Sequence, residues 1–382
     1  MSVTVVPFGE AHIEPAAALL AARHRQDRTW VPELPSQFED PAASSTVLQA
    51  LCAQDGMEGV AALHGGSLVG FMLGAAELGS PAAAWAGMMR PRSAEIPYAG
   101  FAAESGDGRL YRSMYAVLAA EWLNQGITTH YISIPANRDT AETWSDLGFG
   151  RLIEMGVRDT EPSATTHLTQ ARDIEVRRAT AADQEAIQTL MTEMLRAWSS
   201  PPAFIPFLPE TTAARRQFIA ELSADPACPH WLAIADGWVV GMHIFTEPAS
   251  AHWNVSTLQS PPQSVYLFLA STMPEERSRG VGAALLAHTM AWAREAGYAR
   301  CTAHYVTATR ATTFWRGLGL RPASHWLTRS IDERALGARS GIATDTKNVA
   351  TRQYRRRTAK KRRLTVSDQL LEQRLLVVPP AS

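Results

Sequence analysis

Residues 277–282 read Arg-Ser-Arg-Gly-Val-Gly, a combination that suits the binding of an anion. An apolar run, 265–272, precedes them and a helix-like stretch, 283–296, follows, so they are predicted to form a turn between a strand and a helix. The first N–H groups of a helix lack partners within it and lie at the positive end of its dipole. Glycine lets an anion approach the backbone closely, and the two arginines add positive charge. The segment therefore predicts a site for a phosphate or a diphosphate.

The segments after this helix predict where a second group of residues lies. Gly297 and Tyr298 end the helix, residues 301–306 are predicted to form a strand, and residues 308–318 a short amphipathic helix. Residues 314–320, at the end of that short helix, read Phe-Trp-Arg-Gly-Leu-Gly-Leu. The predicted order is strand, glycine-containing turn, helix, strand and short helix.

This order of motifs resembles the GNAT (GCN5-related N-acetyltransferase) superfamily. In that family an Arg/Gln-x-x-Gly-x-Gly/Ala loop binds the pyrophosphate of acetyl-CoA, and a later Phe-Tyr-x-x-x-Gly-Phe segment packs beside the thioester. The first motif is matched by Arg277, Gly280 and Gly282. The second departs from the family, because Trp315 stands at the place of the usual Tyr, and Ala308 stands where Asn is common. The resemblance spans roughly residues 3–330, and its specific part is the phosphate loop.

The resemblance implies that acetyl-CoA is the acyl donor and that an amine is the acceptor. It also implies that the end of the central strand offers main-chain groups to the pantetheine arm, that the turn holds the diphosphate, and that an aromatic ring lies near the thioester. The positions that match are Leu269, Ala270, Ser271, Thr272, Arg277, Ser278, Arg279, Gly280, Val281, Gly282, Ala283 and Phe314.

The reaction requires a group that takes a proton from the amine, whose pKa is about 10.4. Two candidates are Glu247, at the end of a predicted hairpin strand, and His304, on the strand after the motif helix. His243 and Tyr305 are the next candidates, although a lone histidine in a strand is more often structural than catalytic. Trp315 cannot protonate the departing sulfur, but a thiol with a pKa of about 8.5 leaves tolerably as a thiolate beside a helix N-terminus.

One sequence pattern occurs twice in the chain, at a constant offset of 171 residues. Because chance similarity would drift in register, the constant offset indicates a duplicated domain. The matching positions are Gly70 with Gly241, Gly126 with Gly297, and residues 144–149 with residues 315–320.

The two copies differ at the predicted phosphate turn. Gly106, Arg109 and Tyr111 stand at the places of Arg277, Gly280 and Gly282, while Asn137 stands where the second copy has Ala308. We expect the Arg and Tyr side chains to crowd the phosphate path. The first copy is therefore predicted to be degenerate and to complete the fold or shape the acceptor cleft.

The pattern predicts an α/β fold of two tandem GNAT-like domains, each a mostly antiparallel twisted sheet flanked by helices. The predicted boundaries are 1–158 for the degenerate copy, 159–172 for a linker, 173–332 for the copy with the acetyl-CoA site, and 333–382 for a basic tail. Predicted elements of the first copy are strands at 3–6, 97–102 and 130–134, a hairpin at 59–73, and helices at 14–25, 44–53, 110–124 and 138–147. Those of the second are a strand at 174–178, helices at 182–198 and 210–222, and a hairpin at 231–245.

The charge of the tail is unlike that of the rest of the chain. The net charge is −1, yet residues 347–382 hold ten Lys or Arg against Asp368 and Glu372. Such a segment is typical of a disordered, solvated extension, and it could also meet nucleic acid or an acidic surface. Only Tyr354 is interleaved as a stacking partner, so the solvated extension is the simpler interpretation.

Composition suggests a cytoplasmic globular protein, because 46% of residues are hydrophobic and 19% are charged. Cys52, Cys228 and Cys301 are widely spaced, so neither a disulfide framework nor a metal site is expected. No apolar stretch is long enough to suggest a membrane span, and the start does not resemble an export signal.

The sequence thus predicts an acetyl-CoA-dependent N-acyltransferase whose second copy is active. A rival hypothesis is a non-catalytic acyl-CoA-binding or regulatory module, which the unusual Trp315 and Ala308 favour. A third is an acetyltransferase that associates with nucleic acid through its basic tail.

Overall fold

A computed structural model describes residues 3–77, 88, 90, 92–161, 174–206, 208–247 and 257–338. Residues 1–336 form one compact unit, and a second unit begins at Gly337. The basic tail from 339 onward, and most of the predicted linker, lie outside the described residues.

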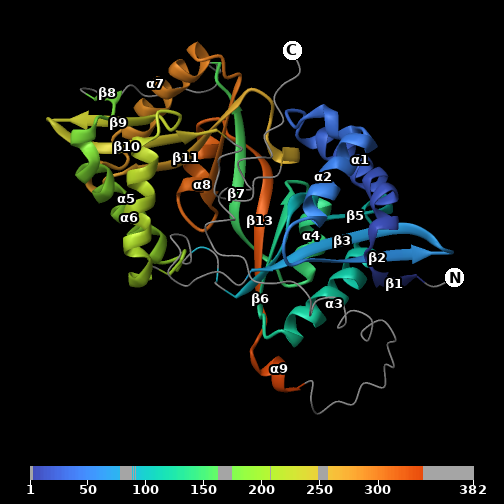
Figure 1. Ribbon diagram of the computed structural model, residues 1–382. Coiled ribbons are helices and arrows are strands. Elements are labelled where there is room, and N and C mark those ends of the chain that lie inside the picture. The colour runs from blue at the N-terminus through green and yellow to red at the C-terminus, as the bar shows by residue number, and fades with distance from the viewer. Residues whose placement is uncertain are drawn as a thin grey trace. The chain divides into compact units, whose positions relative to one another are not determined.

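The first half of the compact unit contains strands flanked by four helices (Figure 1). Its strands are β1 (Thr4–Pro7), β2 (Met57–His64), β3 (Ser67–Glu77), β4 (Ser93–Ile96), β5 (Phe101–Ala103), β6 (Thr129–Pro135) and β7 (Gly150–Asp159). Its helices are α1 (Ile13–Trp30), α2 (Pro41–Cys52), α3 (Gly108–Asn124) and α4 (Arg138–Asp146). The strand predicted at 97–102 is interrupted, because a tight turn, closed by the N–H of Gly100 on the carbonyl of Pro97 at 2.7 Å, separates β4 from β5.

The second half repeats this order. Its strands are β8 (Glu175–Arg178), β9 (His230–Ala235), β10 (Trp238–Thr246), β11 (Ser264–Thr272), β12 (Arg300–Val306) and β13 (Arg321–Ser330). Its helices are α5 (Gln184–Ser199), α6 (Thr212–Ala224), α7 (Val281–Glu295) and α8 (Ala311–Gly317), followed by the short α9 (Arg334–Ala338). Several equivalent elements begin 171 residues apart, as in β1 and β8, α1 and α5, β6 and β12, and β7 and β13.

All strands join one 13-stranded sheet, which confirms the predicted α/β fold and also links the two halves. The order along the sheet is β1-β2-β3-β4-β6-β13-β7-β12-β11-β10-β9-β8, and β5 pairs with β3. The pairs β4–β6 and β11–β12 are parallel, and the other described pairs are antiparallel. The last strand of each half therefore pairs with a strand of the other half, because β13 pairs with β6 and β7 pairs with β12.

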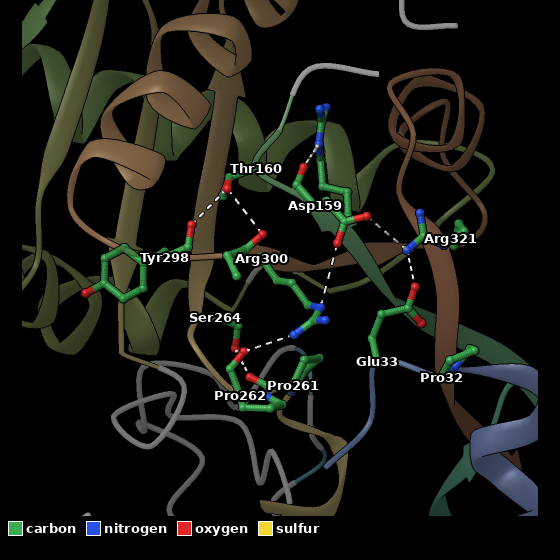
Figure 2. Close-up of polar contacts among 12 residues, drawn as sticks. Pro32, Glu33, Asp159, Thr160, Pro261, Pro262, Ser264, Tyr298, Arg300 and Arg321 are labelled. Carbon is green, nitrogen blue, oxygen red and sulfur yellow. Dashed lines mark hydrogen bonds and ion pairs between the residues drawn. The ribbon is translucent and has the colours of Figure 1, made fainter. Parts of the chain in front are cut away.

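Polar contacts at the end of β7 help to hold this exchange in place (Figure 2). The Asp159 carboxylate lies 3.7 Å from Arg300, at the start of β12, and 3.7 Å from Arg321, at the start of β13. Arg321 also pairs with Glu33, which follows α1. The Thr160 hydroxyl donates to the carbonyl of Tyr298 at 2.8 Å. Exposed pairs of this kind contribute little singly, so the backbone pairing of β7 carries most of the connection.

Each half has two apolar clusters, one on each face of its strands. In the second half α7 and α8 cover one face, with Leu285, Val265 and Trp315 among the buried residues, while α5 and α6 cover the other, with Leu190 and Tyr266 (Figure 1). In the first half α3 and α4 cover one face and α1 and α2 the other. The second half also reaches into the first, since Leu258 packs in the cluster under α1 and α2. Among the described helices, none combines the length and the apolar character that crossing a membrane requires.

Candidate active site

The predicted anion-binding turn connects β11 to α7. Eight residues, 273–280, separate the two elements, and Gly280 is the N-cap of α7. Gly280 has a φ of 88°, in the left-handed region where glycine is favoured, and its carbonyl accepts the N–H of Ala284 at 2.9 Å. Within the described residues, the N–H groups from Ser278 to Ala283 make no hydrogen bond of good geometry to the protein. The start of α7 therefore presents a row of free donors with the helix dipole behind them.

The second glycine of the turn brings α7 and α8 into contact. A Cβ added to Gly282 would lie 2.7 Å from Cζ of Phe314, which is too close for any real side chain. The Phe314 ring therefore lies on the backbone of the second glycine, and the side chain is 38% exposed. The two motifs that the sequence predicted to act together do meet at this point.

The two arginines of the turn lie at its exposed rim. Arg277 donates from Nε to the carbonyl of Thr272 at 3.2 Å. Arg279 lies 3.0 Å from both oxygens of the Glu276 carboxylate. Both contacts are solvent-exposed, so an incoming anion can compete for these guanidinium groups.

The parallel strands β11 and β12 separate beside this turn. They pair from Ser264 with Arg300 to Leu267 with Ala303, although β11 continues to Thr272 and β12 to Val306. Past this point β11 still pairs with β10 on its other edge. The edge of residues 269–272 that faces β12 thus has no strand partner among the described residues, which leaves main-chain groups available to a ligand.

The four predicted pantetheine-contacting positions lie on this free stretch of β11. Leu269 is buried in the α5–α6 cluster, and Ser271 donates its hydroxyl to the carbonyl of Leu190 at 3.0 Å. Ala270 and Thr272 are partly exposed. The side chains of Leu269 and Ser271 are therefore structural, and a ligand would meet the main chain of this stretch.

His304 lies where the two strands begin to separate. It follows Ala303, the last residue of β12 that pairs with β11, and its Nδ1 lies 2.8 Å from the hydroxyl of Tyr266. Burial lowers the pKa of His304 to about 4, so the ring is neutral at pH 7. Its low pKa makes it a weak base.

Glu247 lies elsewhere. It follows Thr246, which pairs with Tyr266, whereas Gly241, at the other end of β10, pairs with Thr272 beside the turn. Its carboxylate accepts the Tyr298 hydroxyl at 2.5 Å, and this bond raises the pKa of Tyr298 to about 12. The structure therefore brings His304, and not Glu247, to the separated strands.

The remaining catalytic candidates are enclosed on the α7–α8 face. His243 is buried, with its Nδ1 3.3 Å from the Thr289 hydroxyl, and burial lowers its pKa to about 3. Its ring lies 6.0 Å from that of Trp315, which is buried in the same cluster. Tyr305 donates its hydroxyl to Glu154 at 2.6 Å.

The equivalent turn of the first half is shorter and already holds an anion of its own. Only four residues, 104–107, separate β5 from α3. Asp107 is the N-cap, and its carboxylate accepts the N–H of Arg109 at 2.9 Å. A carboxylate thus fills the helix N-terminus where a phosphate would bind.

The prediction that the side chains of Arg109 and Tyr111 crowd the phosphate path is wrong. Arg109 is 89% exposed and pairs with Asp107. Tyr111 is buried, with its ring 5.3 Å from Phe101 and 6.2 Å from Trp144. The offset of 171 does not hold across this turn, because the first half has four fewer residues there and α3 starts earlier than α7. Asn137 is the N-cap of α4, where its side chain accepts the N–H of Thr140 at 2.8 Å.

The strand edge of the first half is also occupied. Arg23 of α1 donates to the carbonyl of Tyr98 at 2.7 Å and to that of Phe101. Its Nε lies 3.3 Å from the buried carboxylate of Asp27, which accepts the Tyr98 hydroxyl at 3.0 Å. The strand pairing places Phe101, opposite Met72, at the position of Ala270, opposite His243. Arg23 thus binds main-chain acceptors at an edge whose equivalent in the second half has no strand partner on the side of β12 among the described residues.

The sequence interpretation missed Glu154, which lies on β7. Glu154 is fully buried and contacts Tyr305, Arg316 and His325. A lone acidic residue inside the apolar run Leu-Ile-Glu-Met-Gly-Val was the available signal, because a buried carboxylate needs partners.

Comparisons with known proteins find acetyltransferases. A model of the acetyltransferase (GNAT) family matches residues 192–320, which include β11, the turn and α7. A GCN5-related N-acetyltransferase from Sphaerobacter thermophilus is 14% identical, with a TM-score of 0.52, over 86% of this chain and 95% of that one. The GCN5-related glucosamine N-acetyltransferase region of a fungal multi-domain GH3 β-N-acetylglucosaminidase is also 14% identical, with a TM-score of 0.50, over 86% of this chain and 38% of that one. At such identities the likeness concerns the fold. A search of curated protein sequences returns no match.

Proposed function

Because residues 192–320 carry a domain of the GNAT acetyltransferase family, we propose that the protein is an acetyl-CoA-dependent N-acyltransferase that acts with its second half. The observation that carries the proposal is the open N-terminus of α7. Its free N–H groups, the two turn glycines and the rim arginines suit a diphosphate.

The separated strands supply the second part of the proposed site. The edge of residues 269–272, which has no strand partner on the side of β12 among the described residues, suits the amide groups of a pantetheine arm, which bind as an added strand would. His304 lies at the point of separation, where the reacting end of such an arm would arrive.

The proposed reaction transfers an acetyl group from sulfur to nitrogen. The amine nitrogen bonds to the thioester carbonyl carbon, the carbon–sulfur bond breaks, and CoA leaves as a thiolate. We assign the amine proton to His304 Nε2, directly or through a water, because Nδ1 is engaged with Tyr266. A thiol with a pKa of about 8.5 is a tolerable leaving group as the thiolate, which takes its proton from solvent.

We propose that the first half binds no CoA. Asp107 fills the start of α3, the connecting turn is half as long, and Arg23 occupies the strand edge. Its contribution is structural, since β7 pairs with β12 and Met88 packs with Ile205 and Val306 near the separated strands.

Calorimetry with CoA and a thiol-release assay test the proposal together. The folded protein should bind CoA at one site per chain, and acetyl-CoA should release free thiol faster when a suitable primary amine from a panel is added. Absence of CoA binding would overturn the proposal.

A second candidate function is acyl-CoA binding without transfer. It is favoured by Trp315, which is buried and offers no acidic hydroxyl, and by the low pKa of His304. Tight CoA binding with no amine-dependent thiol release across the panel would favour this candidate.

A further inference from the structure

A buried carboxylate of the first half ties together three elements of the second. Tyr305 on β12 lies directly opposite Glu154 on β7, which lies directly opposite His325 on β13. Glu154 accepts the Tyr305 hydroxyl at 2.6 Å and is held at both oxygens by Arg316 of α8, at 2.9 Å and 2.5 Å. The His325 ring lies 3.5 Å away.

These bonds keep Glu154 charged in spite of its burial. Burial alone would raise the pKa of Glu154, but the hydrogen bonds from Arg316 and Tyr305 lower it on balance. The His325 ring is neutral at pH 7, because burial lowers its pKa to about 4. The contact between Glu154 and Arg316 is therefore a charge-assisted, bidentate pair that fixes the geometry of both partners.

Arg316 connects this carboxylate to the proposed diphosphate turn through one short helix. Phe314 precedes Arg316 by two residues in α8, and its ring lies on the backbone of Gly282. Between them Trp315 is buried in the cluster under α7. The orientation of α8 relative to β7 thus decides where the Phe314 ring lies beside the turn.

We propose that Glu154 is a positioning residue: through Arg316 it holds α8 against the turn and so sets the affinity of the second half for CoA. The inference rests on the proposed function, because it concerns the same site. The first half would then influence ligand binding, although none of its groups contacts the ligand.

The test is the dissociation constant for CoA of the full-length Glu154→Gln variant, measured by calorimetry. The amide is neutral and cannot form the same bidentate pair, so α8 should loosen and CoA should bind about tenfold more weakly, within the usual range for coupling through packed elements. The KM for acetyl-CoA should rise by a similar factor, while kcat stays within about twofold because the reacting groups are untouched.

Asp27→Asn is the matched control. Asp27 is also a buried carboxylate bonded to one Arg and one Tyr, but it lies in the first half on α1. The Asp27→Asn substitution should lower the midpoint of thermal unfolding and leave the CoA dissociation constant unchanged. Equal CoA affinity in Glu154→Gln and wild type would overturn the inference, as would equal weakening in both variants.

The double variant Glu154→Gln/Arg316→Met provides the second measurement. With the pair already broken, removing Arg316 should weaken CoA binding no further. This variant also removes the uncompensated guanidinium, so it keeps the test available if the single variant folds poorly. Additional weakening would overturn the inference. Failure of the wild-type protein to bind CoA would instead reject the proposed function itself.

Discussion

Helices α3 and α7 occupy equivalent positions in the two halves, but their N-termini are capped differently. Asp107 closes α3 with a carboxylate, whereas Gly280 closes α7 with no side chain. Both solutions satisfy the fold, since a helix start needs an acceptor from the protein, from water or from a ligand. The start of α3 is therefore capped by the protein itself, whereas that of α7 is left for water or a ligand.

The strand edges show the same relation. Arg23 and Asp27 of the first half stand at the positions of Met194 and Trp198 in the second. Arg23 binds the carbonyls that would face a ligand, while Met194 belongs to an apolar cluster and leaves the equivalent edge open. Arg23 therefore occupies the strand edge of the first half, whereas residues 269–272 of the second half have no strand partner on the side of β12 among the described residues.

The largest expected effect is at the open helix start. Gly280→Glu places a carboxylate against the diphosphate and a Cβ at a φ of 88°, so CoA binding measured by calorimetry should fall by at least about a thousandfold. Arg109→Glu, 171 residues earlier, should leave the affinity unchanged, because that side chain is exposed at the closed helix. Equal damage from both changes would contradict the assignment of one working site.

A second prediction compares two buried histidines. His304 and His130 each lie 2.8 Å from a Tyr hydroxyl, and burial lowers the pKa of each to about 4. His304→Gln should lower kcat on the order of 100-fold while the affinity for CoA is kept. His130→Gln should leave kcat unchanged, because His130 lies in the first half.

The pH dependence sharpens this prediction. The ratio of wild-type kcat to that of His304→Gln should stay constant from pH 8 to about 5. It should decrease as the pH falls through about 4, because protonated His304 no longer accepts a proton. A ratio that already decreases near pH 6.5 would show that His304 titrates at the ordinary pKa of a histidine and that burial does not lower it.

Much of the fold could be predicted because local signals agree with one another. The two hairpins turn at the glycine-containing segments 65–66 and 236–237, and the turn before α7 lies where its glycines indicated. The last strand of each half was not predicted. In β7 and β13, Glu154, Arg158, His325 and Arg329 interrupt the apolar pattern, because their partners come from the other half.

The site could be predicted only where a short motif defines it. The turn could be predicted from its glycines and arginines. The positions of Glu247 and His304 depend on which end of their strands lies beside the turn, and the hydrophobic pattern of a strand does not indicate which end that is. The difference in length between the two turns, four residues before α3 and eight before α7, cannot be read from the sequence, because the offset of 171 is the same before and after them.

A smaller effect is expected at the contact between α7 and α8. Gly282→Ala puts a Cβ 2.7 Å from the Phe314 ring, which must move, and CoA should bind roughly threefold to tenfold more weakly. The matched change is Gly108→Ala, whose Cβ would lie 2.8 Å from the Thr143 hydroxyl at the start of α3. This variant should leave the affinity unchanged, so similar losses in calorimetric titrations of both would contradict a local effect of Phe314.

The smallest effect on CoA is expected at the closed helix. Asp107→Ala removes the N-cap of α3 and should lower the free energy of unfolding by about 1 kcal/mol in denaturant titrations. It should not create a second site, since the turn still has four residues and Arg23 still occupies the strand edge. The double variant Asp107→Ala/Gly280→Glu isolates the first half, because the site of the second half is blocked. CoA uptake by this variant would show that the carboxylate cap alone silences the first half, whereas no uptake would mean that turn length and Arg23 keep it closed.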